Sequence, residues 1–139
     1  MSHWSFLPAG MLVFFCSIAP AIADPCKAPL PAQAGTRFSG TVQYVGDGDG
    51  LCVGRTVDPN EWIEVRLADF DAPEVHQPGG AAAKAALEHI ALHREVTCTV
   101  KRGRNGRVVS FDRVIARCQI ATDSIGDILR QVGIAAGGN

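Results

Sequence analysis

Short segments in which apolar and polar residues alternate set the strongest limit on what this chain can fold into. They span residues 39–45, 51–53 and 62–70, and two more surround Cys98 and Cys118. Alternation with a period of two is typical of strands that bury one face. After the third segment, residues 81–93 are rich in alanine with apolar residues at helical spacing, and a short helix is expected around residues 125–132.

This order of elements predicts one small domain, because 139 residues leave room for a single compact unit. Five strands, with one helix after the third and another at the end, favour a β-rich α+β fold. The leading candidate is a small closed antiparallel barrel of the oligonucleotide-binding (OB) type, five-stranded and with two helices. The turn Asp47-Gly48-Asp49-Gly50 joins the first two strands as a hairpin.

The N-terminal segment differs from the rest of the chain. Residues 6–23 carry no charged side chain and close on Ala21-Ile22-Ala23, the small residues that a signal peptidase recognises. A membrane anchor is the alternative, but Pro8 and Pro20 interrupt a stretch that is already short for crossing ~30 Å of hydrocarbon. We therefore predict a secretory signal peptide at residues 1–23, an extended lead-in at 24–37 and the domain at 38–139. The mature protein would be periplasmic or secreted, without stable membrane association.

Removal of that segment leaves four cysteines, an even number that suits disulfides in an oxidising compartment. Four cysteines allow three pairings, and four reduced thiols are the alternative. Cys98 and Cys118 each fall on the apolar face of an expected strand. If those two strands pair, the bridges are Cys98 to Cys118 and, by remainder, Cys26 to Cys52.

Charge is balanced over the chain but uneven along it. The 13 Lys and Arg residues against 14 Asp and Glu residues exclude a wholly basic protein that coats nucleic acid. Residues 47–74 nevertheless carry eight acids and two bases, whereas residues 94–117 carry seven bases and two acids. Two such clusters suit a site that binds a hard cation and a phosphate together, with two solvated faces as the alternative. The basic segment 101–107 is interpreted as a solvated link that could also follow a nucleic-acid backbone.

Two acidic elements stand next to the expected strands. One is the turn 47–50, and the other is the sequence Asp69-Phe70-Asp71-Ala72-Pro73-Glu74, which follows the strand that carries Arg66. Carboxylates from the two elements could bind one Ca²⁺ together with a backbone carbonyl. Glu74 could then act on a metal-bound water.

These motifs, taken in order, resemble the staphylococcal nuclease-like (thermonuclease) family, in its exported bacterial branch. The matching segments are 40–42 with 47–49, 65–74, 111–113 and 129–133, and the resemblance runs over residues 38–136. It implies an OB-type barrel and a Ca²⁺-dependent nuclease. The family reaction is hydrolysis of phosphodiester bonds in DNA and RNA, which leaves 3′-phosphate ends.

Carried over by position, the resemblance also implies a set of site residues. The calcium ligands would be Asp49, Asp71 and the backbone carbonyl of Ala72. Arg66 and Arg113 would bind the phosphate, and Glu74 would orient or deprotonate the attacking water, so that these three form the catalytic set. The expected partner is a DNA or RNA substrate, bound by a monomer.

Three positions depart from the family pattern. Gly50 and Ala72 stand where threonine is common, and Phe111 stands where tyrosine is common, so hydroxyl groups are missing near the site. The alternative function is therefore a catalytically weak OB-barrel module that binds nucleic acid or another polyanion. The segments 66–74 and 112–118 also resemble exported proteins associated with succinoglycan exopolysaccharide synthesis.

Overall fold

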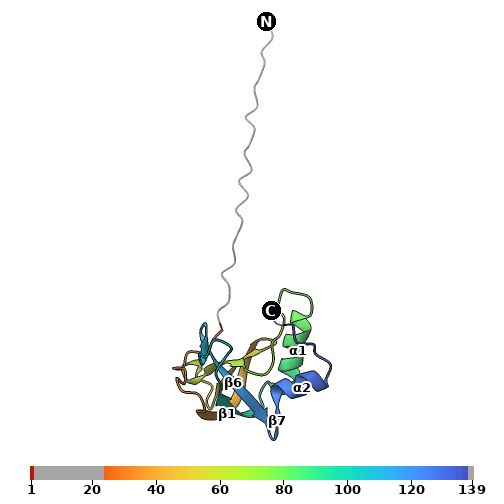
Figure 1. Cartoon of the computed structure of the whole chain (residues 1–139). Helices are drawn as coiled ribbons and strands as arrows, with labels where there is room; N and C mark the ends of the chain where they lie inside the picture. Colours follow the sequence, from red (N-terminus) through yellow and green to blue (C-terminus); the bar gives the residue numbers. More distant parts are fainter. Residues whose placement is uncertain (2–23, 138–139) are drawn as a thin grey trace.

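The computed structural model describes Met1 and residues 24–137, so the predicted signal peptide lies outside the described residues apart from Met1 (Figure 1). The elements in chain order are β1 (Arg37–Asp47), β2 (Gly50–Gly54), the 3₁₀ helix η1 (Pro59–Glu61), β3 (Ile63–Leu67), α1 (Gly80–Ala91), β4 (Glu95–Val100), β5 (Val109–Ser110), β6 (Arg113–Ile120), β7 (Asp123–Ser124) and α2 (Ile125–Gln131). Within the described residues, every helix is too short or too polar to cross a membrane.

Five strands close into a barrel, which confirms the predicted fold class. β1 pairs with β2 and β4, β2 pairs with β3, and β4 pairs with β6. Pairing of β3 with β6 completes the ring. The expectation of an antiparallel barrel is wrong for that last pair, which is parallel. Between β3 and β6 the chain passes through α1, β4 and β5, and a long crossover of this kind is what parallel neighbours need.

The barrel core is made by the inward positions of the alternating segments. Val65 and Leu67 on β3 and Val114 on β6 are fully buried, as are Leu87 of α1 and Leu129 of α2. Burying each such side chain stabilises the fold by roughly 1.5–3 kcal/mol. The two helices lie next to each other on one side of the barrel (Figure 1). A disulfide joins Cys98 of β4 to Cys118 of β6, where the two residues face each other in the strand register, with Cα atoms 4.0 Å apart.

β2 is buried on both faces. Leu51 and Val53 point into the core, while the outer face consists of Gly50, Cys52 and Gly54. This outer face has almost no side-chain bulk, so other groups lie directly over it. A Cβ atom on Gly50 would stand 3.0 Å from Nη1 of Arg113, and a Cβ atom on Gly54 would overlap the ring of Trp62. The two glycines therefore make room for side chains that belong to other elements.

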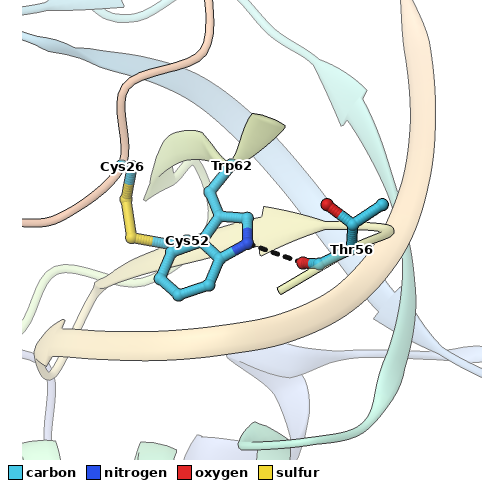
Figure 2. The surroundings of a disulfide bond; sticks show 4 residues. All are labelled: Cys26, Cys52, Thr56 and Trp62. Atoms are coloured by element: carbon cyan, nitrogen blue, oxygen red, sulfur yellow. Dashed lines mark hydrogen bonds between the residues drawn. A yellow bond between two sulfur atoms is a disulfide. The ribbon is translucent and has the colours of Figure 1, made fainter. Parts of the chain in front are cut away.

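The segment before β1 covers the middle of this outer face. Cys26 forms a disulfide with Cys52, with Cα atoms 5.7 Å apart, so both predicted pairings are confirmed. The backbone N–H groups of Lys27 and Ala28 donate to the carbonyls of Pro59 and Trp62, each over 3.0 Å. Figure 2 shows the Trp62 indole beside the disulfide, with its Nε1 donating to the carbonyl of Thr56 over 2.8 Å. The lead-in is thus fastened to the barrel by covalent and hydrogen bonds.

Candidate phosphate and metal site

A pocket of about 500 Å³ lies beside β3 and the start of β6. Its lining includes all six residues that the sequence marked out as a site: Asp49, Arg66, Asp71, Ala72, Glu74 and Arg113. The fold thus brings together side chains as far apart in the sequence as Asp49 and Arg113, which are separated by 64 positions. Loop residues 102–105, between β4 and β5, form a further part of the wall.

Hydrogen bonds hold the two acidic elements in place. The carbonyl of Asp49 accepts from the N–H of Leu67 over 2.8 Å, so the turn after β1 is fixed to the end of β3. The Asp49 carboxylate accepts from the N–H of Ala72, also over 2.8 Å. The carbonyl of Asp71 accepts from the N–H of Gly137. The loop that carries Asp71 and Ala72 is therefore held by hydrogen bonds to two separate segments of the chain.

Arg66 points out of β3 because its neighbours Val65 and Leu67 fill the inward positions. Its Nη1 donates to the carbonyl of Phe70 over 2.8 Å. Its Nη2 contacts the carboxylates of both Asp71 and Asp49, the latter over 3.5 Å. The guanidinium is thus held between the strand and the acidic loop, with one nitrogen shared by two carboxylates.

Arg113 reaches the same carboxylate from the neighbouring strand. Its Nη1 lies 3.4 Å from Oδ1 of Asp49 and 3.5 Å from Oδ2 of Asp47. Each oxygen of Asp49 therefore faces a different guanidinium, because Arg66 contacts Oδ2. Two guanidinium groups that converge on one carboxylate are also placed to bind separate oxygens of one phosphate group.

Asp49 is the most buried charged side chain of the site, with 6% of the residue exposed. Burial raises its pKa to about 6, and the nearby Asp47 carboxylate acts in the same direction. The hydrogen bond from the N–H of Ala72 and the charge of Arg66 oppose this shift. The ionised form of Asp49 is therefore costly here without further positive charge.

Sequence reasoning missed two contributors to this site. Asp47 was interpreted only as part of the turn, yet it pairs with Arg113. Arg104 was placed in a solvated link that could also follow a nucleic-acid backbone, without a contact to the acidic loop. Its Nη2 lies 3.4 Å from the Asp71 carboxylate, although its side chain is 85% exposed. The strongly basic composition of segment 101–107 was the available indication. Glu74 is an exposed residue that lines the pocket. Phe111 is 94% exposed and is not one of the residues that line the pocket.

The donor atoms suit an oxygen-ligated cation. Asp49 and Asp71 both contact the same nitrogen of Arg66, so the two carboxylates come within reach of a single positive centre. Oxygen ligands of this kind match the preference of Ca²⁺. Among residues 24–137, however, three or more His, Cys, Asp or Glu side chains are nowhere grouped to hold a metal ion. The Ala72 carbonyl and water would have to complete the coordination.

The fold and the site together define an OB-type barrel with an arginine and carboxylate pocket on its side. The chain is similar to micrococcal nuclease from Shigella flexneri, with 34% identity over 102 residues. This match covers 70% of the present chain and 57% of the relative, so the chain spans less than two thirds of the length of that protein. No protein-family model matches the chain. The match agrees with the resemblance to nuclease-like proteins found in the motifs.

Proposed function

We propose that this protein is a calcium-dependent nuclease that hydrolyses phosphodiester bonds of DNA, RNA or both and leaves 3′-phosphate ends. The observation that carries the proposal is the convergence of Arg66 and Arg113 on Asp49 in a pocket that Asp71 and Glu74 also line. The similarity to micrococcal nuclease supports it.

Arg66 and Arg113 would bind the non-bridging oxygens of the scissile phosphate. Negative charge grows on these oxygens as the phosphorus is attacked, and preorganised guanidinium groups stabilise that charge most strongly in a pocket with little water. Both side chains are only about one-fifth exposed, at 20% and 21%. Their present carboxylate partners show that each guanidinium lies within reach of an anion in this pocket.

Asp49, Asp71 and the carbonyl of Ala72 would hold the calcium ion. When bound, the ion supplies positive charge that offsets the carboxylates and stabilises the charge developing on the phosphate. Glu74, at the exposed edge of the pocket, would orient a water molecule and take up its proton. The water oxygen bonds to phosphorus as the bond from phosphorus to the 5′-oxygen breaks, and a proton passes to that oxygen. The products are a 3′-phosphate and a 5′-hydroxyl.

We further infer that the protein acts after export, as a periplasmic or secreted monomer. The two disulfides support an oxidising compartment. Cleavage after Ala23 would make Asp24 the first residue of the mature chain. Mass spectrometry of the exported protein tests this directly, and a mature chain that still contains residues 1–23 would contradict it.

The activity test is digestion of single-stranded DNA by the oxidised, exported protein with Ca²⁺ or with a calcium chelator. We expect activity only with Ca²⁺, and a loss of about 10²-fold or more in a Glu74→Gln variant. Glu95→Gln is the matched control, because Glu95 is an exposed glutamate on β4 that does not line the pocket.

Equal inactivity of the wild type and of Glu74→Gln, together with retained DNA binding, would overturn the proposal. The same pocket would then serve the alternative function, a module that binds nucleic acid or another polyanion. A binding assay with an acidic exopolysaccharide such as succinoglycan would separate those two ligands.

A further inference from the structure

A second hollow, which we call the side groove, adjoins the pocket. It has a volume of about 780 Å³ and is lined by Ala32 of the lead-in and by residues between β4 and β6. Arg102, Asn105 and Ser110 line both the pocket and the side groove. Ser110 pairs with Arg113 in the register of β5 and β6. The junction of the two hollows therefore lies next to the arginine that we propose to bind phosphate.

The side groove has a basic wall. Among the described residues that line it, the charged ones are Arg102 and Arg107, and both are exposed. Hydrogen bonds within the loop hold this wall in shape. The N–H of Gly103 donates to the carbonyl of Arg107 over 2.7 Å, and Nη1 of Arg102 donates to the carbonyl of Gly106 over 2.9 Å. Residues 101–112 carry four bases against one acid, so this side of the molecule attracts a polyanion.

Phe111, which also lines the side groove, has an unfavourable backbone conformation. β5 and β6 pair as far as Ser110 and Arg113, so Phe111 and Asp112 are the two residues of a hairpin turn. Phe111 has a φ of 54°, in the left-handed region that such turns usually fill with glycine or asparagine. A bulky residue is strained there, and with 94% exposure the ring gains little packing in return. Folding alone gives no reason for an aromatic ring at this position.

An exposed aromatic ring beside arginines is typical of sites for single-stranded nucleic acid. Any base can stack on the ring, because every base has a flat π-face, while the arginines contact the phosphates. A base inside a duplex is already stacked and paired, so it would have to be extruded before it could lie on Phe111. The side groove therefore suits an unpaired strand.

We propose that the side groove binds the nucleotide next to the scissile phosphate in a single-stranded substrate, with its base stacked on Phe111 and its phosphate held by Arg107. The strand would run from Arg113 past Ser110 into the side groove, where the lead-in forms part of the wall through Ala32. The inference rests on the proposed nuclease function and adds the form of nucleic acid that the site takes. It also gives a role to a ring that the fold leaves unexplained.

The test compares two labelled oligomers of equal length by fluorescence anisotropy, in calcium chelator so that binding is measured without cleavage. One is oligothymidylate, and the other is an abasic oligomer with the same sugar and phosphate chain. We expect the wild type to bind oligothymidylate about tenfold more tightly, the size of one stacked base. Phe111→Asn should lose this preference, and Phe111→Trp should keep it.

Two further variants separate the base contact from the phosphate contact. Arg107→Ala should weaken the binding of both oligomers by a similar factor of about three, because a phosphate contact does not depend on the base. Val57→Asn is the matched control for Phe111→Asn, because Val57 is an apolar residue with 88% exposure that lines neither hollow. It should leave both affinities unchanged.

Urea unfolding distinguishes a ligand contact from a structural role of the ring. Asparagine tolerates the left-handed conformation, so Phe111→Asn should unfold at the same urea concentration as the wild type or at a higher one. A clearly lower midpoint would assign the ring to the fold and overturn the proposal.

The binding results and the nuclease activity can fail separately. Equal affinity of the wild type for the two oligomers, or a preference that survives in Phe111→Asn, would overturn the inference even if the protein cleaves DNA normally. A protein that prefers oligothymidylate through Phe111 but stays inert with Ca²⁺ would refute the nuclease and leave the side groove as a single-strand binding site.

Discussion

The interior and the outer side of the barrel are built from the same strands, but burial has opposite effects on their residues. On β3, Val65 and Leu67 point into an apolar core, whereas Glu64 and Arg66 point toward charged neighbours. Burial stabilises the first pair. On the outer side, burial raises the pKa of Asp49 and of Glu64, so the ionised forms cost stability. Burial of residues therefore stabilises the fold in the interior, whereas on the outer side burial opposes the charged forms of carboxylates.

Replacing Arg113 by lysine should give the largest effect on activity, with little change in stability. Lysine keeps the charge but loses the planar fork that binds two oxygens, so kcat/KM on single-stranded DNA should fall about 10²- to 10³-fold. The free energy of unfolding should change by less than about 1 kcal/mol, because the side chain lies outside the core. Normal activity together with a large loss of stability would place Arg113 on the structural side of the comparison.

Leu87→Ala is the reverse experiment. Leu87 is fully buried in the core, and its truncation should cost about 2–5 kcal/mol of stability in urea unfolding. Specific activity assayed well below the melting temperature should remain near the wild-type value. A strong loss of activity in the folded variant would show that the core and the site are not separable.

The two disulfides allow the interior and the outer side to be compared directly, because one lies in the core and the other on the outer face of β2. They close segments of 20 and 26 residues, for which chain entropy gives similar contributions of about 3 kcal/mol each. Replacing Cys98 and Cys118 by alanine should cost more than replacing Cys26 and Cys52, since both core sulfurs also lose packing. Equal losses in urea unfolding would mean that the bridge to the lead-in contributes as much to the fold as the core bridge.

Asp49→Asn should give the smallest effect on stability, and that effect should have the opposite sign. The pKa of Asp49 is raised from 3.8 to about 6 in the folded state, so its contribution to stability is present at low pH and is lost as the pH rises through about 6. The asparagine variant should be inactive yet more stable than the wild type by about 1 kcal/mol at pH 7 in chelator. The difference should vanish near pH 4, and destabilisation at pH 7 would contradict the assignment.

Sequence reasoning reached the features that depend on local pattern. Alternation located the strands, and the apolar faces of the segments around Cys98 and Cys118 identified their bridge. The parallel pairing of β3 with β6 was missed because the alternation within a strand does not show its direction relative to a distant partner. The pairing of Asp47 with Arg113 and the approach of Asp24 to Gly46 were missed for a related reason. Each joins residues that become neighbours only when the barrel closes.

The disulfide pattern has a consequence for how the chain is made. From Cys26 onward, each bridge joins two cysteines that follow each other directly in the sequence, first Cys26 with Cys52 and then Cys98 with Cys118. When the polypeptide emerges with its N-terminus first, Cys52 appears after Cys26 and is its correct partner. The first bridge can therefore form before Cys98 has emerged. Oxidation in the order of emergence would form the same two bridges that the structure contains.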